Sequence, residues 1–196
     1  MRNPEETRNY IIEVAAPVFN KNGYAGTSLS DVLEQTTLTK GAIYHHFENK
    51  DELALAALEY NLRFVSDANF AAVREKTHSC DKLTAFAEVF IKNYDIMKQM
   101  GGCPVVNAAI DSDDVNEQIK NRVCRFIKMW RKSVKDIIEQ GKSRSEIRPG
   151  TDAESFAMNF ISTIEGSLAM SKVTDDRKFL ENAVGLVKSL VAEIRG

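Results

Sequence analysis

Polar side chains between residues 39 and 50 have the chemistry needed to contact nucleic acid. Their hydroxyl, ammonium and imidazole groups can hydrogen-bond to phosphates or base edges: Thr39, Lys40, Tyr44, His45 and Lys50. Gly41 and Ala42 lie among them, and such small residues allow a helix to approach base edges closely. A helix over residues 40–47 is therefore a candidate for docking in the major groove of double-stranded DNA.

The elements that must position these side chains are helical throughout. Hydrophobic residues recur three and four positions apart, only 10 Gly and 4 Pro interrupt them, and no strand-like alternation stands out. Thr39 can cap the helix that follows it, the hydroxyls of residues 27–30 can cap the preceding one, and Gly23 can end the first. The expected helices cover residues 7–22, 29–36, 40–47, 50–74, 81–100, 104–110, 114–141, 152–171 and 175–195.

The composition is that of an ordinary globular protein and argues against disulfide-rich, zinc-binding and membrane proteins. The 196 residues are 43% hydrophobic and 28% charged, with a formal net charge of −2. The first 50 residues carry five basic against six acidic side chains, so we expect DNA binding there to depend only modestly on salt. Three widely spaced cysteines argue against a disulfide framework and structural zinc. We expect a cytoplasmic protein without membrane contact, because the chain lacks a signal-like or membrane-length apolar run.

The order of residue types in residues 23–53 is more specific than the sequence pattern of a generic helix-turn-helix. It reads Gly23-Tyr24-x-x-Thr27-Ser28, then Asp31-Val32-Leu33, then Thr39-Lys40-Gly41-Ala42-Ile43-Tyr44-His45-His46-Phe47-x-x-Lys50-x-x-Leu53. This order resembles the TetR family of repressors. The resemblance implies an all-α fold with a three-helix DNA-binding domain, residues 1–49, and a larger helical ligand-binding and dimerisation domain, residues 50–196. It also implies a homodimer that binds a palindromic operator and is released by a small-molecule inducer.

The resemblance also implies which side chains face DNA. In the family, positions equivalent to Thr27, Lys40, Tyr44, His45 and Lys50 contact the DNA backbone, and those of Gly41 and Ala42 lie against bases. The full predicted DNA-binding set is Thr27, Ser28, Thr39, Lys40, Gly41, Ala42, Tyr44, His45, His46 and Lys50.

The turn between the two motif helices departs from the family pattern. The family usually has Ala-Gly-Val-Ser there, whereas this chain has Thr36-Thr37-Leu38-Thr39. Thr37 then stands where glycine is favoured, which strains a β-branched residue if its φ is positive. We expect a slightly rearranged turn.

The segment Met97-x-x-Met100-Gly101-Gly102-Cys103-Pro104-Val105-Val106-Asn107 interrupts helical spacing. It is similar to a Gly-Cys-x-x-x-Asn segment of one branch of the family, in which small molecules or reactive electrophiles act as inducers. A thiol at the start of a short helix favours thiolate chemistry, so Cys103 is a candidate sensor. The alternative is a small buried residue in a tight turn.

Inward-facing aromatic, Met and neighbouring polar side chains predict a pocket for an apolar or electrophilic inducer, because family members bind apolar ligands in this region. The predicted pocket residues are Phe64, Phe86, Phe90, Tyr94, Met97, Cys103, Asn107, Phe126, Trp130, Phe160, Ile164 and Glu165. For each residue taken separately, ordinary core packing is the alternative.

The last two predicted helices, residues 152–171 and 175–195, carry apolar faces wider than one packing stripe. This width, together with Gly166, indicates a partner surface, and the resemblance implies a four-helix dimer interface. Residues 120–148 hold ten basic against three acidic side chains. A second nucleic-acid surface is one interpretation of that segment, and a solvated helix face is the other.

Two other classes of protein have weaker support in the sequence. An enzyme is disfavoured because Glu75-x-x-His78 has no second such pair, and no phosphate loop or nucleophile turn occurs. No cofactor or metal site is expected. A helical adaptor that binds protein would explain the near-neutral first 50 residues, with the polar side chains of the motif merely solvated.

Overall fold

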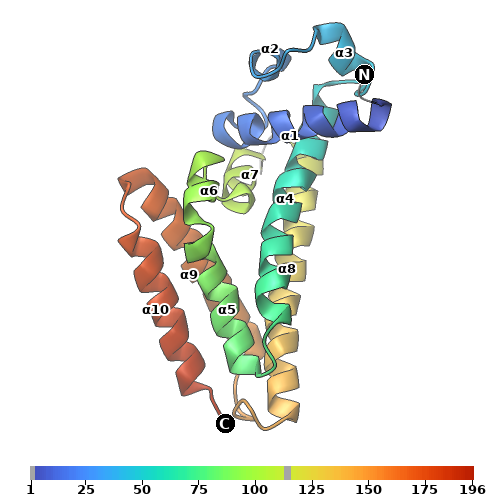
Figure 1. The fold of residues 1–196 in the computed structure, drawn as a ribbon. Coiled ribbons are helices and arrows are strands. Elements are labelled where there is room, and N and C mark those ends of the chain that lie inside the picture. The colour runs from blue at the N-terminus through green and yellow to red at the C-terminus, as the bar shows by residue number, and fades with distance from the viewer. Residues whose placement is uncertain (1–2, 113–115) are drawn as a thin grey trace. The chain divides into compact units, whose positions relative to one another are not determined.

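The computed structural model describes residues 3–112 and 116–196, and this part of the chain is all-α, as predicted (Figure 1). An isolated bridge between Ile147 and Arg195 is its one piece of extended pairing. The helices are α1 (Pro4–Asn22), α2 (Leu29–Leu33), α3 (Lys40–Tyr44), α4 (Lys50–Arg74), α5 (Ser79–Lys92), α6 (Tyr94–Gln99), α7 (Pro104–Ser112), α8 (Glu117–Ser143), α9 (Ala153–Thr174) and α10 (Lys178–Glu193).

The prediction of one continuous helix over residues 81–100 is wrong, because the structure has two helices there, α5 and α6, separated at Asn93. Asn93 has φ −98° and ψ 6°, and its side-chain Nδ2 donates to the carbonyl of Val89 at 2.9 Å. Its own carbonyl accepts from the backbone N–H of Met97 at 2.9 Å, so one residue ends α5 and begins α6. An asparagine in this role competes with the helical backbone for hydrogen bonds.

The other predicted helices are present, with different ends. The motif helices stop at Leu33 and Tyr44 instead of residues 36 and 47, whereas α4 has the predicted bounds. The predicted helix over 114–141 begins at residues 114 and 115, which lie outside the described residues. Gly23 ends α1 with φ 88°, as predicted, because glycine adopts this conformation without a steric penalty.

The first compact unit comprises Met1–Val65 and Gln99–Cys124. In it, α1 packs against α2 and α7, and the buried ring of Phe19 stacks on Tyr24 with centroids 5.8 Å apart. Asn61 of α4 is fully buried and donates through Nδ2 to the carbonyl of Ala16 at 2.9 Å and to the Tyr24 hydroxyl at 3.3 Å. Burial raises the pKa of Tyr24, so its phenol stays protonated.

The second compact unit comprises Ser66–Lys98 and Arg125–Gly196. In it α10 packs against both α9 and α5, which lie beside it in Figure 1. Its core includes an aromatic cluster in which Trp130 stacks on Phe86 and Phe90, with interplanar angles of 16° in both pairs. Helices α4 and α8 each begin in the first unit and end in the second, and the predicted boundary after residue 49 stays a prediction.

Candidate DNA-binding surface and ligand cavity

Two side-chain caps start the helices of the motif. Ser28 and Asp31 form a capping box, in which the Ser28 hydroxyl accepts from the Asp31 N–H and the Asp31 carboxylate accepts from the Ser28 N–H at 2.7 Å. The hydrogen bonds from Ser28 lower the pKa of Asp31. Thr39 caps α3 as predicted, because its hydroxyl accepts from the N–H of Ala42 at 3.3 Å.

The strain predicted at Thr37 is not found. Among the described residues other than glycine, only Ser145 and Asp175 have positive φ. The hydroxyl of Thr36 closes the turn instead, donating to the carbonyl of Leu33 at 3.3 Å and accepting from the N–H of Leu38 at 3.1 Å. A threonine hydroxyl can replace backbone hydrogen bonds in this way, so the turn does not require glycine.

The start and outer face of α3 are open to solvent. Ile43 is buried beneath this face and anchors the helix, together with buried Phe47 after it. Tyr44 is 47% exposed, and the ammonium of Lys40 lies 5.8 Å from the centroid of its ring. Six of the predicted DNA-facing residues are exposed: Ser28, Thr39, Lys40, Gly41, Tyr44 and His45. Ala42 and His46 are half-buried.

Two of the predicted DNA contacts have internal partners. Thr27 is 1% exposed, and its hydroxyl donates to the carbonyl of Gly23 at 2.6 Å. Half-buried Lys50 donates through Nζ to the carbonyl of Ala25 at 2.9 Å. Both residues therefore hold the loop between α1 and α2. A DNA role for their side chains stays a prediction, and for Thr27 it requires the loop to open.

A buried amide clamp joins the end of α1 to the segment before α7. Asn20 is 3% exposed and donates through Nδ2 to the carbonyls of Met100 at 2.8 Å and Gly102 at 3.0 Å. Asn107 donates through Nδ2 to the carbonyl of Gly101 at 2.8 Å and to Oδ1 of Asn20 at 3.1 Å. Asn107, predicted as a pocket residue, thus serves this clamp.

A carboxylate adds a second tie between the same parts of the first unit. Asp111 of α7 accepts from the backbone N–H groups of Tyr24 at 2.6 Å and Ala25 at 3.1 Å. A Cβ at Gly23 would lie 2.5 Å from its Oδ1, so the close approach needs glycine. The loop that leads into α2 is therefore positioned by α7.

The second unit contains a cavity of about 460 Å³, which is within the usual range for small-molecule sites. Buried Phe86, Phe126 and Trp130 form part of its wall, and the exposed side chains of Phe70 and Met129 also line it. The lining residues are Ser66, Asp67, Asn69, Phe70, Val73, Phe86, Phe126, Met129, Trp130, Ser133 and Ile137. Phe86, Phe126 and Trp130 belong to the predicted pocket set.

Five further predicted pocket residues of the second unit do not line this cavity and are buried in its core: Phe90, Tyr94, Met97, Phe160 and Ile164. Phe90 stacks on Trp130 at 5.5 Å, and the Tyr94 hydroxyl donates to the carbonyl of Ser171 at 3.1 Å. Phe160 packs edge-on against Phe86. Their apolar periodicity is fully accounted for by core packing.

Three more predicted pocket residues also lie outside the cavity lining. Phe64 is half-buried and belongs to the first unit, and Glu165 of α9 is buried. Cys103 is buried directly before α7, and its carbonyl accepts from the N–H of Asn107 at 3.0 Å. Burial of the thiol favours the interpretation of Cys103 as a small packed residue over a reactive sensor.

The rest of the cavity lining was not predicted, although two sequence patterns contain all of it except Asp67. On α4, residues 66, 69, 70 and 73 follow helical spacing, as do residues 126, 129, 130, 133 and 137 on α8. These are one stripe on each of the two longest helices. The stripe on α4 mixes polar and apolar residues, so a search for apolar faces does not find it.

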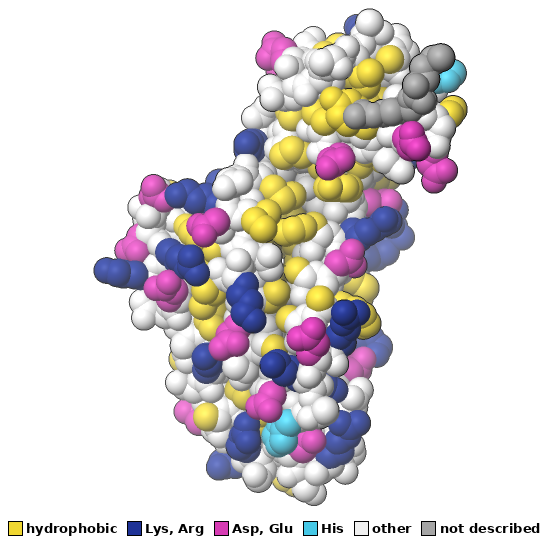
Figure 2. All heavy atoms as spheres, viewed as in Figure 1, with side chains coloured by type: hydrophobic (Ala, Val, Ile, Leu, Met, Phe, Trp, Pro, Cys, Tyr) yellow, Lys and Arg dark blue, Asp and Glu magenta, His cyan; other side chains and the backbone are white. Residues whose placement is uncertain are grey.

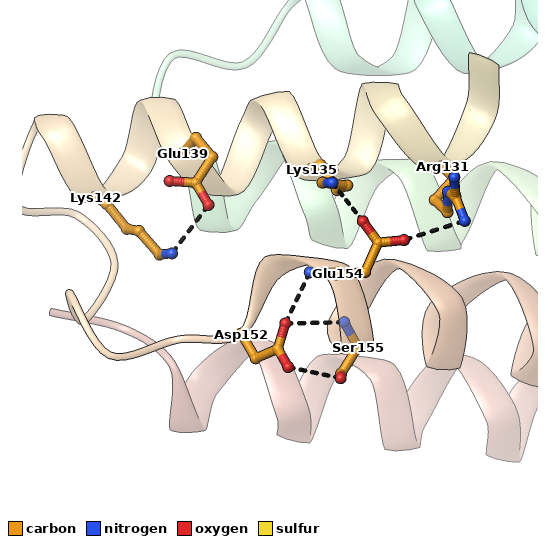
Figure 3. Close-up of polar contacts among 7 residues, drawn as sticks. All are labelled: Arg131, Lys135, Glu139, Lys142, Asp152, Glu154 and Ser155. Atoms are coloured by element: carbon orange, nitrogen blue, oxygen red, sulfur yellow. Dashed lines mark hydrogen bonds and ion pairs between the residues drawn. The ribbon is translucent and has the colours of Figure 1, made fainter. Parts of the chain in front are cut away.

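Half of the basic side chains in residues 120–148 form ion pairs within the chain. Five of these ten side chains have carboxylate partners: Arg122, Arg131, Lys132, Lys135 and Lys142. Figure 3 shows Glu154 of α9 bridging Arg131, at 3.1 Å, and Lys135 of α8. Basic and acidic side chains are intermixed over α5 and α10 on the face shown in Figure 2, and the ion pairs above give the same mixture along α8. These observations favour a solvated helix face over a second nucleic-acid surface.

Within residues 3–112 and 116–196, no helix combines the length and apolar character needed to cross a membrane. Over the same residues, no cluster of three or more His, Cys, Asp or Glu side chains has the arrangement of a metal site.

The fold and the exposed α3 define a helix-turn-helix regulator that binds DNA, and comparison with known proteins identifies its family. Residues 11–57 match the family described as bacterial regulatory proteins, tetR family. Residues 79–187 match the tetracyclin repressor-like C-terminal domain. The chain belongs to the TetR family of transcriptional regulators.

Known structures and relatives agree along nearly the whole chain. A TetR transcriptional regulator from Chloroflexus aurantiacus is 37% identical, with a TM-score of 0.95 and coverage of 100% of this chain and 99% of that one. A TetR-family regulator from Cytophaga hutchinsonii is 34% identical, with a TM-score of 0.92 and coverage of 100% and 98%. The transcriptional repressor DhaR of a Mycobacterium species is 22% identical over 92% of this chain and 89% of its own. These relatives are transcriptional regulators and not enzymes.

Proposed function

We propose that this protein is a ligand-responsive transcriptional repressor that acts in the cytoplasm as a homodimer on a palindromic operator. The observation that carries the proposal is the capped α3, whose exposed face presents Thr39, Lys40, Gly41, Tyr44 and His45 above the buried anchor Ile43. Repression, rather than activation, is supported by the similarity to DhaR, which is named a repressor.

The DNA role is tested by titrating the full chain with duplexes from its own promoter region at two salt concentrations. We expect specific binding that weakens with salt by a modest slope, because the first 50 residues have nearly balanced charge. Lys40→Ala should weaken binding about tenfold or more, the loss of one good phosphate or base contact. The control is Lys92→Ala, an exposed lysine of α5 in the other compact unit. No specific binding, or equal effects of the two variants, would contradict this role for α3.

Dimerisation through α9 and α10 is supported by their unpartnered apolar side chains. Val173 is 82% and Leu186 53% exposed, and a Cβ at Gly166 would meet no described atom within 4 Å. Large exposed apolar side chains gathered on two helices indicate an interface. Leu186→Lys should give monomers in analytical ultracentrifugation and lose operator binding, while Ile96→Lys, at a similarly exposed position on α6, should remain dimeric. A Leu186→Lys protein that stays dimeric would contradict this interface.

Control by ligand is proposed to act through α4. The end of this helix lines the cavity, while its beginning follows the motif directly in the chain. A ligand that prefers the conformer with wrongly spaced recognition helices lowers operator affinity, and the coupling is reciprocal. Saturating operator should therefore weaken inducer binding by the same factor. An inducer affinity that operator DNA leaves unchanged would exclude this mechanism.

A further inference from the structure

The cavity of the second unit contains two buried polar groups whose hydrogen-bonding capacity is unused. Asn69 is 8% exposed, and its Oδ1 has no hydrogen-bond partner among residues 3–112 and 116–196. Trp130 is 3% exposed, and its Nε1 donor likewise has no partner in that part of the chain. Both residues line the cavity. A buried polar group without a partner destabilises the protein, so a ligand that supplies the partner gains binding energy.

The charge of the lining constrains the ligand. Asp67 is the single charged side chain among the described residues that line the cavity, and no lysine or arginine is among them. A buried anion without a cationic partner is strongly disfavoured. The lining therefore suits a neutral or cationic molecule and disfavours a carboxylate or phosphate.

The aromatic residues of the cavity wall favour an aromatic ligand. The rings of Phe86 and Trp130 are nearly parallel, with an interplanar angle of 16° and centroids 6.0 Å apart, and Phe126 meets Trp130 edge-on. Phe90, which lies outside the cavity lining, also stacks on Trp130, with centroids 5.5 Å apart. Phe70, also in the lining, is 68% exposed and gains cover when an apolar ring enters. Aromatic groups of this kind prefer to pack against other rings in stacked or edge-to-face geometry.

We propose that the cavity binds a flat, fused-ring aromatic molecule that is neutral or cationic and carries a lactam-like pair of polar groups. Its N–H donates to Oδ1 of Asn69, and its carbonyl accepts from Nε1 of Trp130. The Asn69 amide can turn toward the ligand, because the terminal torsion of asparagine has broad minima. This inference rests on the proposed function and names the ligand class of its regulatory site.

The test uses three probes of similar ring size: 6(5H)-phenanthridinone, phenanthrene-9-carboxylate and phenanthrene. Trp130 is the only tryptophan of the chain, so quenching of its fluorescence reports occupancy of the cavity without DNA. We expect the lactam to bind at least about tenfold more tightly than either other probe, because it gains two hydrogen bonds to buried groups. Equal or tighter binding of the carboxylate, no advantage over phenanthrene, or no quenching by any probe would each overturn the proposal.

A variant separates the hydrogen bond from general packing. Asn69→Leu should reduce the lactam's advantage over phenanthrene by about threefold or more, because only the contact with Trp130 remains. Phenanthrene binding and the far-UV circular dichroism should stay unchanged and show that the fold is intact. Asn22→Leu, at an exposed position of α1, should retain the preference for the lactam. An Asn69→Leu protein that keeps this preference undiminished contradicts the proposed contact with Asn69.

Operator binding in the presence of each probe distinguishes the two proposals. If the lactam occupies the cavity without weakening operator binding, the ligand class stands and the inducer role fails. If the carboxylate occupies the cavity and releases the operator, the regulatory function stands and the proposed ligand class fails.

Discussion

Replacing Asn20 by alanine tests the view that an amide clamp fixes α1 to the segment before α7. The Asn20 side chain makes three hydrogen bonds, donating to the carbonyls of Met100 and Gly102 and accepting from Asn107. The Asn20 side chain is 3% exposed, and its hydrogen bond to Gly102 is buried. Alanine at this position leaves both carbonyls without the amide.

The expected loss follows from these three contacts. A typical hydrogen bond contributes about 1 kcal/mol net, so Asn20→Ala should lower the free energy of unfolding by about 3 kcal/mol. In a protein of this size, that loss lowers Tm by about 6–12 °C. Operator affinity should fall as well, because the loop into α2 begins one helical turn after Asn20.

Urea unfolding followed by circular dichroism, at one fixed protein concentration, measures this change. Asn22→Ala is the matched control, because Asn22 lies on the same helix turn with an exposed side chain. The control should change the free energy of unfolding by less than about 0.5 kcal/mol. An Asn20→Ala protein as stable as the control would refute the reasoning.

A double-mutant cycle with Asn107→Ala tests the clamp itself. Because the two side chains are bonded to each other at 3.1 Å, their effects should not add, and the coupling should lie between about 0.5 and 3 kcal/mol. Strictly additive effects would mean that the two amides act independently and that the clamp does not exist as a unit.

Two further predictions concern backbone geometry and acid stability. Gly101→Ala should lower the free energy of unfolding by more than about 1 kcal/mol, because φ of Gly101 is +99° and a Cβ there would lie 3.0 Å from the Cα of Lys21. Gly150→Ala is the control and should change this free energy little, because a Cβ at Gly150 meets no described atom within 4 Å. Hydrogen bonds from Ser155 lower the pKa of Asp152 from its ordinary 3.8. The ionised carboxylate therefore contributes its full share to the free energy of unfolding above pH 3.8, and this share is lost as pH falls through the lowered pKa. Asp152→Asn should thus be less stable than the parent in urea at pH 7 and should approach it in strong acid; a gap that is constant with pH contradicts this.

The sequence predicted those parts of the fold that depend on local chemistry. Thr39 caps α3 because a hydroxyl can accept the N–H of Ala42, three positions along, in any context. Gly23 ends α1 because it tolerates a positive φ. The break at Asn93 was not predicted, since an asparagine is compatible with a helix interior as well as with its end.

The sequence pattern did not predict contacts between residues that are far apart in the chain. Asn107 resembled a ligand contact, but its partner Asn20 lies 87 positions away, and no local rule links them. The same holds for Asp111 and the N–H of Tyr24. The apolar spacing of α5, α6 and α9 predicted burial correctly but did not distinguish core from cavity wall.

The run from Thr39 to Lys50 illustrates the division most clearly. Residue types and spacing alone determined that a short capped helix with small and polar residues forms there, because capping and periodicity act within a few residues. Only the tertiary structure decided which of these groups remain available, since Lys50 is bonded to Ala25 while Tyr44 stays exposed. Whether a side chain is free to contact DNA depends on which distant residues pack against it, and these neighbours are set by the tertiary fold and not by the local sequence.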